Sequence, residues 1–217
     1  MKFSNETIQI LKNFATINPN MIFKQGDILA TINSAKSIFA RVKIQEIIPQ
    51  EFAIYELNSL LQILSFAEDQ DIEFGDKSLT VKNDMGSFEY FYCTVSFPSP
   101  PAKEVVLEPH FTFELSSKDI QNITKVAGLL AAPNLSIVAK DGKVTMKIGD
   151  KKIDSVNNFK KIIGKFDGNF SCDIATENLK MIPDDYVVTL SQKMACEFRS
   201  KTGSMVYLIA MEPSSKM

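Results

Sequence analysis

The sequence of 217 residues predicts an α+β protein made of two similarly built domains. One observation is a proline-rich segment, residues 97–109, with four prolines in thirteen residues, which disfavours both helix and central strand. The other is that the residues on either side show the same order of helices and strands, although few residues are identical. We therefore expect one domain at 1–97, a connector at 98–109 and a second domain at 110–217, since the length suits two domains.

Each half opens with a segment in which apolar residues recur at helical spacing behind a capping residue. The candidate N-caps are Ser4 or Asn5 in the first half and Ser116 or Ser117 in the second. The apolar stripes are Ile8, Leu11, Phe14 and Ala15, and then Ile120, Ile123, Ala127 and Leu130. The two helices are expected to end at Asn18-Pro19 and before Pro133, because proline does not continue a helix.

Strand-like runs follow each helix, and each half then contains a run that leads from a strand into a second, short helix. These two runs are residues 51–66 and 169–183. Asp141-Gly142 is a favourable hairpin turn between two strands. Each half ends with three more strands, expected at 71–74, 78–83 and 87–95, and at 185–190, 195–200 and 204–211. We expect the residues after Glu212 to be frayed.

The composition argues against an enzyme. His110 is the one histidine, so any site that needs a histidine base depends on a residue at the end of the connector. No phosphate-binding glycine motif, zinc-protease motif or metal-ligand cysteine spacing occurs, so we expect no catalytic residue, no metal and no cofactor. The cysteines lie in strand-like runs, which indicates buried thiols in a reducing compartment. The longest strictly apolar stretch is residues 126–132, far below the ~20 that cross a membrane, so no membrane partner is expected.

The charge pattern is compatible with a nucleic-acid-binding surface that covers only part of the protein. Residues 1–108 carry a net charge of −5 and residues 109–217 carry +3, so only part of the surface can be basic. The helix faces opposite the apolar stripes bear lysine and amide side chains, which reach phosphates without reading bases. An ordinary solvated helix face would look similar, and this alternative stays open at this point.

Two blocks of sequence resemble a known family. LKNFATIN, residues 11–18, and AIYELNSLLQILS, residues 53–65, resemble the DNA polymerase sliding clamp of T-even-like bacteriophages. The length, the order of elements and the proline-bearing connector are also similar to that family. The resemblance implies two clamp-type domains per chain and a closed trimeric ring whose inner wall carries twelve helices, four from each chain.

The same resemblance implies the function and the partners. The family encircles double-stranded DNA without sequence specificity, tethers the phage DNA polymerase, and is opened by an ATP-driven clamp loader. Its members also serve as mobile activators of late transcription and have no active site of their own. The implied location is the cytoplasm of the infected bacterial host. A β-rich oligomeric phage structural protein, from a tail or a capsid, is the alternative, and a small hydrolase that uses carboxylates is a third reading.

The expected DNA contacts follow from the resemblance and from the helix faces. Lys12 lies in the first matching block, and Lys2 matches the start of the family sequence. The contacts carried over by helical face are Gln9, Lys118, Gln121, Lys125 and Lys180. The second helix offers Asn58 and Gln62 where a lysine is expected, which argues against tight static binding.

Ring closure and partner docking need two further surfaces. In clamp-type rings an edge strand of one subunit pairs with an edge strand of the next, and the candidates are residues 87–95 and 157–166. The expected interface residues are Phe88, Glu89, Tyr90, Tyr92, Phe159, Lys160, Lys161 and Ile163. Charged edge strands that merely resist aggregation are the alternative. The expected apolar pocket for a partner's tail consists of Val106, Leu107, Met181, Ile209 and Met211.

Overall fold

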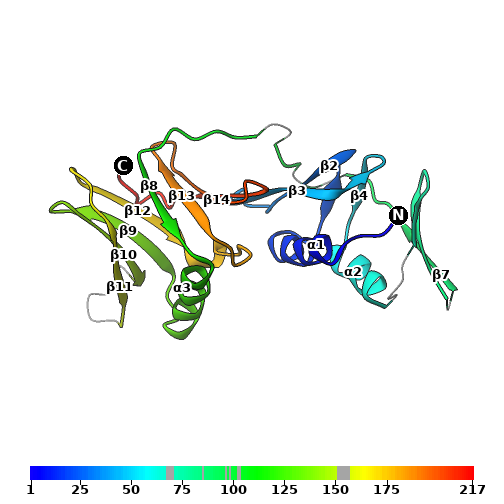
Figure 1. The fold of residues 1–217 in the computed structure, drawn as a ribbon, viewed down its shortest axis with the longest axis horizontal. Helices are drawn as coiled ribbons and strands as arrows, with labels where there is room; N and C mark the ends of the chain where they lie inside the picture. The colour runs from blue at the N-terminus through cyan, green and yellow to red at the C-terminus, as the bar shows by residue number, and fades with distance from the viewer. Residues whose placement is uncertain (67–70, 85, 96, 98, 102–103, 151–156) are drawn as a thin grey trace. The chain divides into compact units, whose positions relative to one another are not determined.

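The computed structural model describes residues 1–66, 71–84, 86–95, 97, 99–101, 104–150 and 157–217 (Figure 1). The chain forms two compact units, one of Met1–Ala35 and Phe39–Pro100, the other of Lys36–Ile38 and Pro101–Met217. Among the described residues, no helix is both long and apolar enough to span a bilayer.

The first unit packs two contacting helices against small antiparallel sheets (Figure 1). Its elements are α1 (Asn5–Ile17), β1 (Met21–Phe23), β2 (Gly26–Ile32), β3 (Ile38–Ile48), β4 (Phe52–Ile54), α2 (Leu57–Phe66), β5 (Asp71–Phe74), β6 (Ser78–Asn83) and β7 (Gly86–Phe91). β1 pairs with β4, β2 pairs with β3, and β5-β6-β7 form a meander. Leu11 and Phe14 of α1 and Leu57 and Leu60 of α2 are buried in the core.

The second unit has one α-helix among its described residues and two sheets. Its elements are β8 (Phe111–Leu115), α3 (Ser117–Leu129), β9 (Asn134–Lys140), β10 (Lys143–Gly149), β11 (Phe159–Gly164), β12 (Phe170–Ala175), the 3₁₀ turn η1 (Thr176–Asn178), β13 (Tyr186–Ser191), β14 (Ala195–Ser200) and β15 (Met205–Ala210). Within this unit the strands follow the orders β11-β10-β9-β12 and β8-β13-β14-β15. Tyr186 and Tyr207 are fully buried in the core, where the Tyr186 hydroxyl donates a hydrogen bond to the Ile182 carbonyl oxygen at 2.6 Å.

The predicted helix starts are confirmed. The Ser4 hydroxyl accepts a hydrogen bond from the Thr7 amide at 3.2 Å, and α1 ends before Asn18 as the Asn-Pro pair predicts. At α3, Ser116 and Asp119 form a reciprocal capping box. These ends agree with prediction because each N-cap hydrogen bond joins residues that are three apart in the sequence.

The predicted hairpin at Asp141-Gly142 is also confirmed. Both residues have positive φ, 51° and 75°, as a two-residue hairpin turn between β9 and β10 requires. Strand β8 was not predicted, because its five residues lie directly between the connector and a strong helix pattern. Strand β7 ends at Phe91 rather than Val95, and the Cys93 amide instead donates to the Ala53 carbonyl.

The prediction of a second helix within residues 169–183 is wrong. This segment, described throughout, forms β12 and only the short turn η1. The Thr176 amide and hydroxyl donate to the carbonyl oxygens of Pro133 and Ala132, at 2.9 and 2.6 Å, so both groups are bound to the loop after α3. The implied set of four helices per chain is therefore reduced to α1, α2 and α3 among the described residues.

The C-terminal residues are not frayed as expected. The Glu212 amide donates to the Asp173 carbonyl oxygen at 2.8 Å, and Lys216 bridges to Ser171 on β12. The Ser214 hydroxyl donates to the buried Asp173 carboxylate at 3.1 Å. These bonds connect residues far apart in sequence, so local patterns do not predict them.

A carboxylate on β3 anchors the start of α1. Glu46 accepts hydrogen bonds from the Thr7 hydroxyl, at 2.6 Å, and from the Ser4 amide. Partial burial alone would raise the pKa of Glu46, but the hydrogen bonds from Thr7 and Ser4 outweigh it and hold this pKa below its ordinary value. The buried Thr7 hydroxyl thus depends on an ionised partner.

We predict that Glu46→Ala lowers the free energy of unfolding by about 1–3 kcal/mol, because it removes the acceptor of a buried hydroxyl and of a helix-start amide. A folded-state pKa below the unfolded one stabilises the fold above the unfolded pKa. That stability is lost as pH falls through the folded pKa. Denaturant unfolding at neutral and at acidic pH measures both effects.

The matched control is Glu51→Ala, which removes an exposed carboxylate paired with Lys24 and should cost less than about 1 kcal/mol. Equal losses in the two variants, or a Glu46→Ala deficit that persists undiminished in acid, would contradict the role of the Glu46 charge.

Candidate nucleic-acid interface

One concavity in the first unit brings together three of the predicted DNA contacts. Lys2, Gln9 and Lys12 line a hollow of about 650 Å³ along α1, and Asn5 and Ser65 share it. Gln9 and Lys12 are exposed on the α1 face opposite the buried stripe. Helical periodicity therefore positions an amide and an ammonium group for contact with an anion.

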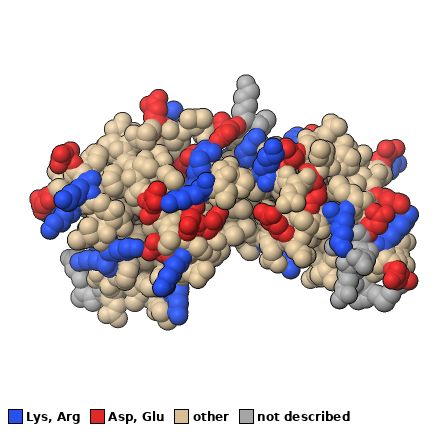
Figure 2. All heavy atoms as spheres, viewed as in Figure 1, with Lys and Arg blue, Asp and Glu red and all other residues tan. Residues whose placement is uncertain are grey.

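The charge balance of this hollow favours a loosely held anion. Among the described residues, Lys12 makes no hydrogen bond or ion pair with another side chain. The hollow contains one carboxylate, Glu46, whose oxygens are already occupied by Ser4 and Thr7. Figure 2 shows charges of both signs interspersed over the visible face of the protein. Any DNA contact here is sparse.

Helix α3 of the second unit presents a similar face. Ile120 and Ile123 are buried, whereas Lys118, Gln121 and Lys125 are exposed. Both lysines lack a side-chain partner within the described part of the chain. The predicted α3 contacts therefore share one accessible face.

The expectation that Lys180 lies on a helix face is wrong. Lys180 follows η1 without belonging to any helix, and its amide donates to the Asn178 carbonyl oxygen at 2.9 Å. The residue is half-buried and has a further interaction of its own. Its assignment depended on the helix that residues 169–183 do not form.

Strand β7 is the edge of its meander and exposes most of its side chains. Within the described residues it pairs with β6 alone. Phe88 is exposed, whereas the Tyr90 hydroxyl turns inward and donates to the Glu56 carbonyl oxygen at 2.9 Å. Tyr92 stacks on Phe52 at 4.7 Å between ring centroids. Tyr90 and Tyr92 therefore attach the edge strand to the rest of the first unit through this hydrogen bond and this ring contact.

Strand β11 is the matching edge of the β11-β10-β9-β12 sheet in the second unit. It pairs with β10 alone among the described residues, and it exposes Phe159, Lys160 and Ile162. Lys161 instead lies 2.5 Å from the Asp119 carboxylate of α3. This ammonium, together with the Ser116 capping groups, holds the pKa of Asp119 below its ordinary value.

The residues expected to form an apolar pocket do not form one open surface. Val106 is exposed and Leu107 is half-buried, whereas Met181, Ile209 and Met211 belong to the buried core of the second unit. Ile209 is buried because it lies inside β15. The residues just after β15 are held in place by backbone hydrogen bonds. Because the side chains of Met181, Ile209 and Met211 are buried, they are not directly accessible to a docking partner.

His110 and Cys172, which catalysis by a histidine or a cysteine could use, are engaged in packing. His110 lies against Phe166 and Phe170, at 5.1 and 5.4 Å between ring centroids. Burial raises the pKa of the Cys172 thiol to about 12, which keeps it protonated. The described residues contain no group of three or more histidine, cysteine, aspartate or glutamate side chains suited to a metal ion.

Comparison with known sequences gives one consistent family. The family described as DNA polymerase processivity factor matches residues 4–90. The "Sliding clamp" of Escherichia phage RB69 is 32% identical over 228 residues, covering 99% of this chain and 98% of the relative. The "Sliding clamp" of Enterobacteria phage T4 is 28% identical, with the same coverage. That of Vibrio phage KVP40 is 26% identical and covers 98% of this chain and 99% of its own.

Solved structures support the same fold at low identity. PCNA from Thermococcus kodakaraensis matches with a TM-score of 0.69 and 12% identity, covering 97% of this chain and 98% of that one. The proliferating cellular nuclear antigen of Entamoeba histolytica matches with a TM-score of 0.67 and 14% identity, covering 95% and 94%. At such identities the likeness establishes the fold alone.

The different surroundings of two neighbouring lysines on β11 give a prediction. Lys161→Gln should lower the unfolding free energy by up to about 1 kcal/mol, because it removes the partner of a capping-box carboxylate. At a protein concentration low enough to keep the chain monomeric, Lys160→Gln should be neutral, because Lys160 is exposed and unpaired among the described residues. Denaturant unfolding of both variants measures the difference, and equal values would contradict a role for Lys161 in holding Asp119.

Proposed function

Because the chain belongs to the sliding clamp family of T4-like phages, we propose that three copies close into a ring around duplex DNA and tether the phage DNA polymerase. Sliding clamps are processivity factors rather than enzymes, and the function of this chain is that of a DNA polymerase processivity factor. The observation that carries the proposal is the 32% identity to a sliding clamp along 99% of the chain. This end-to-end likeness favours a clamp over a phage tail or capsid component.

The two edge strands support closure by a heterologous contact. β7 exposes Phe88 and Glu89, and β11 exposes Phe159 and Lys160, with Ile163 half-buried. Pairing β7 of one subunit with β11 of the next would satisfy two free backbone edges and oppose an acidic strand to a basic one. Repetition of this contact closes a ring if the rotation between subunits is 120° on average. Lys161, already paired with Asp119, contributes less to this contact than Lys160.

DNA contact in this proposal is weak and independent of sequence. Lys2, Lys12, Lys118 and Lys125 supply positive charge, and Gln9 and Gln121 supply neutral donors. Lysine and amide groups reach phosphate oxygens and carry no base readout. A ring holds DNA by encirclement, so few phosphate contacts suffice and friction stays low.

The remaining assignments complete the proposal. Residues 1–97 and 110–217 act as the two clamp domains, joined by the connector 98–109. Exposed Val106 and half-buried Leu107 offer the apolar contact for the tail of a polymerase. An ATP-driven loader opens the ring, late transcription factors use it as a mobile activator, and the site of action is the cytoplasm of the infected host.

The assembly is testable by mass. Three chains of 24.3 kDa give a ring of 72.9 kDa, which light scattering at micromolar concentration should detect. Lys160→Glu should shift the equilibrium toward monomer, because it opposes one carboxylate to another across the β7–β11 contact. Lys193→Glu, which reverses an exposed lysine in the β13–β14 turn, should leave the mass unchanged. A monomer at high protein concentration would refute the ring.

The DNA-facing assignment is testable by processivity. The triple variant Lys12→Glu/Lys118→Glu/Lys125→Glu should fold normally, because all three side chains are exposed, and should shorten primer-extension products. In direct binding, a plot of log affinity against log salt concentration has a negative slope, and each lost phosphate contact should make that slope shallower by about 0.9. Lys193→Glu is again the control. Unshortened products from the triple variant would show that these lysines do not face DNA.

A further inference from the structure

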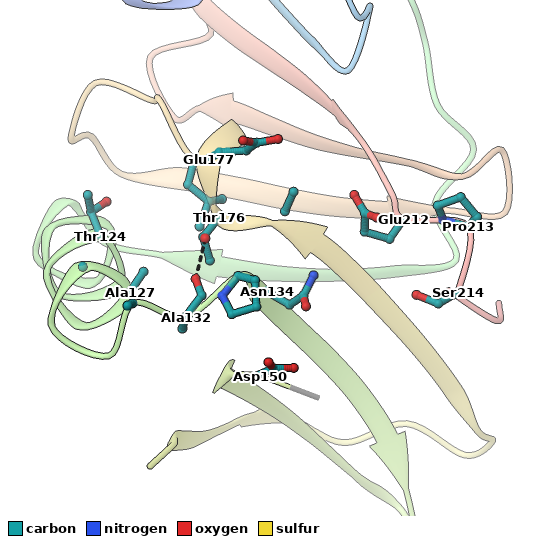
Figure 3. Close-up of a pocket in the computed structure, with 15 residues that line it drawn as sticks. Thr124, Ala127, Ala132, Asn134, Asp150, Thr176, Glu177, Glu212, Pro213 and Ser214 are labelled. Atoms are coloured by element: carbon teal, nitrogen blue, oxygen red, sulfur yellow. Dashed lines mark hydrogen bonds between the residues drawn. The ribbon is translucent and has the colours of Figure 1, made fainter. Parts of the chain in front are cut away.

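The second unit contains a groove beside α3 whose lining includes none of the residues proposed to contact DNA or to close the ring. Its volume is about 1110 Å³, and its lining includes Thr124 and Gly128 of α3, Ala131 just after that helix, Glu177 of η1, Glu212 of the C-terminal segment, and Asp150 (Figure 3). All of the lining residues belong to the second unit. We call this hollow the α3 groove.

The α3 groove borders η1, where the second unit has a 3₁₀ turn in place of a second helix. In the first unit α1 packs against α2, whereas in the second unit residues 176–178 form only a 3₁₀ turn. The side of α3 that borders the groove consists of small residues, and a Cβ added at Gly128 would meet no atom within 4 Å. Small apolar residues continue along the groove at Ala132 and Ala175.

Hydrogen bonds hold the lining of the groove in place. Thr176 binds the Ala132 and Pro133 carbonyl oxygens at 2.6 and 2.9 Å, which fixes η1 against the loop after α3. In the C-terminal segment, the Ser214 hydroxyl and the Glu212 amide donate to Asp173, at 3.1 and 2.8 Å. The groove is therefore preformed, which reduces the cost of ordering on binding.

The groove carries negative charge. Its described lining contains the carboxylates of Asp150, Glu177 and Glu212 and includes no lysine, arginine or histidine. Figure 3 shows Glu177 and Glu212 on one side and Asp150 on the opposite side. The C-terminal end of α3 also borders the groove, and its last turn has no basic residue to offset the negative end of the helix dipole.

We propose that the α3 groove docks an extended peptide segment of a partner protein, with lysine or arginine side chains directed at Glu177 and Glu212. The volume exceeds the 300–1,000 Å³ typical of small-molecule sites, which fits a peptide. The small residues admit a backbone at close range, and charge complementarity selects a cationic sequence. This surface is chemically distinct from the apolar contact at the connector, so the proposal does not depend on the proposed ring or on its DNA contacts.

The test uses the full-length protein and a fluorescein-labelled peptide of alternating lysine and alanine, with a glutamate–alanine peptide as the probe control. Fluorescence anisotropy should detect saturable binding of the lysine peptide only. Glu177→Gln/Glu212→Gln should weaken binding by about fivefold or more, because it removes both charges of one wall. Asp141→Asn/Asp167→Asn removes two exposed carboxylates elsewhere in the same unit and should change binding by less than about twofold.

A steric variant separates docking from general charge attraction. Gly128→Phe fills the groove without changing charge, and open space at Gly128 together with the low helix propensity of glycine predicts normal folding. It should abolish saturable binding while circular dichroism stays unchanged. Binding that survives Gly128→Phe, or that falls equally in the Asp141→Asn/Asp167→Asn control, would overturn the proposal. Loss of a higher oligomer in the Glu177→Gln/Glu212→Gln variant would assign the groove to a second copy and also overturn it.

Discussion

Free strand edges are the constraint on which the proposed assembly depends. Both β7 and β11 leave one side of their backbone unpaired among the described residues, and both expose aromatic or aliphatic side chains there. Such edges promote uncontrolled pairing unless a specific partner covers them. Pairing β7 with β11 of a second copy covers both of these edges at once. Repetition around a three-fold axis would leave no β7 or β11 edge unpaired. The inward hydrogen bond of Tyr90 and the stacking of Tyr92 keep β7 in position for that contact.

The proposed encirclement also explains why the proposed DNA-facing surface can be weakly charged. The exposed faces of α1 and α3 offer isolated lysines among amides, and the visible surface mixes both signs of charge (Figure 2). A protein that binds DNA by contact needs many neutralised phosphates, and its affinity falls steeply with salt. A ring needs only a low-friction lining. The charged capping groups of α1 and α3 instead stabilise the helices that carry this lining.

The sequence predicts the parts of the fold that local chemistry determines. Helix starts at Ser4 and Ser116 and the Asp141-Gly142 hairpin agree with the structure because each depends on a few neighbouring residues. The second helix of the second half fails because the Thr176 hydroxyl binds Ala132, a partner 44 residues away. The prediction that Lys180 lies on a helix face fails for the same reason, because it depended on that helix. The pairing of Lys161 with Asp119 and the anchoring of the C-terminal residues by Asp173 likewise join distant segments, and no local pattern signals them.

If this chain retains DNA by topology, its release must depend on whether the DNA has a free end. The protein is loaded onto a nicked circular duplex by a clamp loader, and its retention in high salt is followed before and after the circle is cut once. We expect long retention on the circle and rapid loss from the linear product, because a ring slides off a free end. Equal rates of loss from both forms would show that the protein holds DNA by contact, and would contradict encirclement.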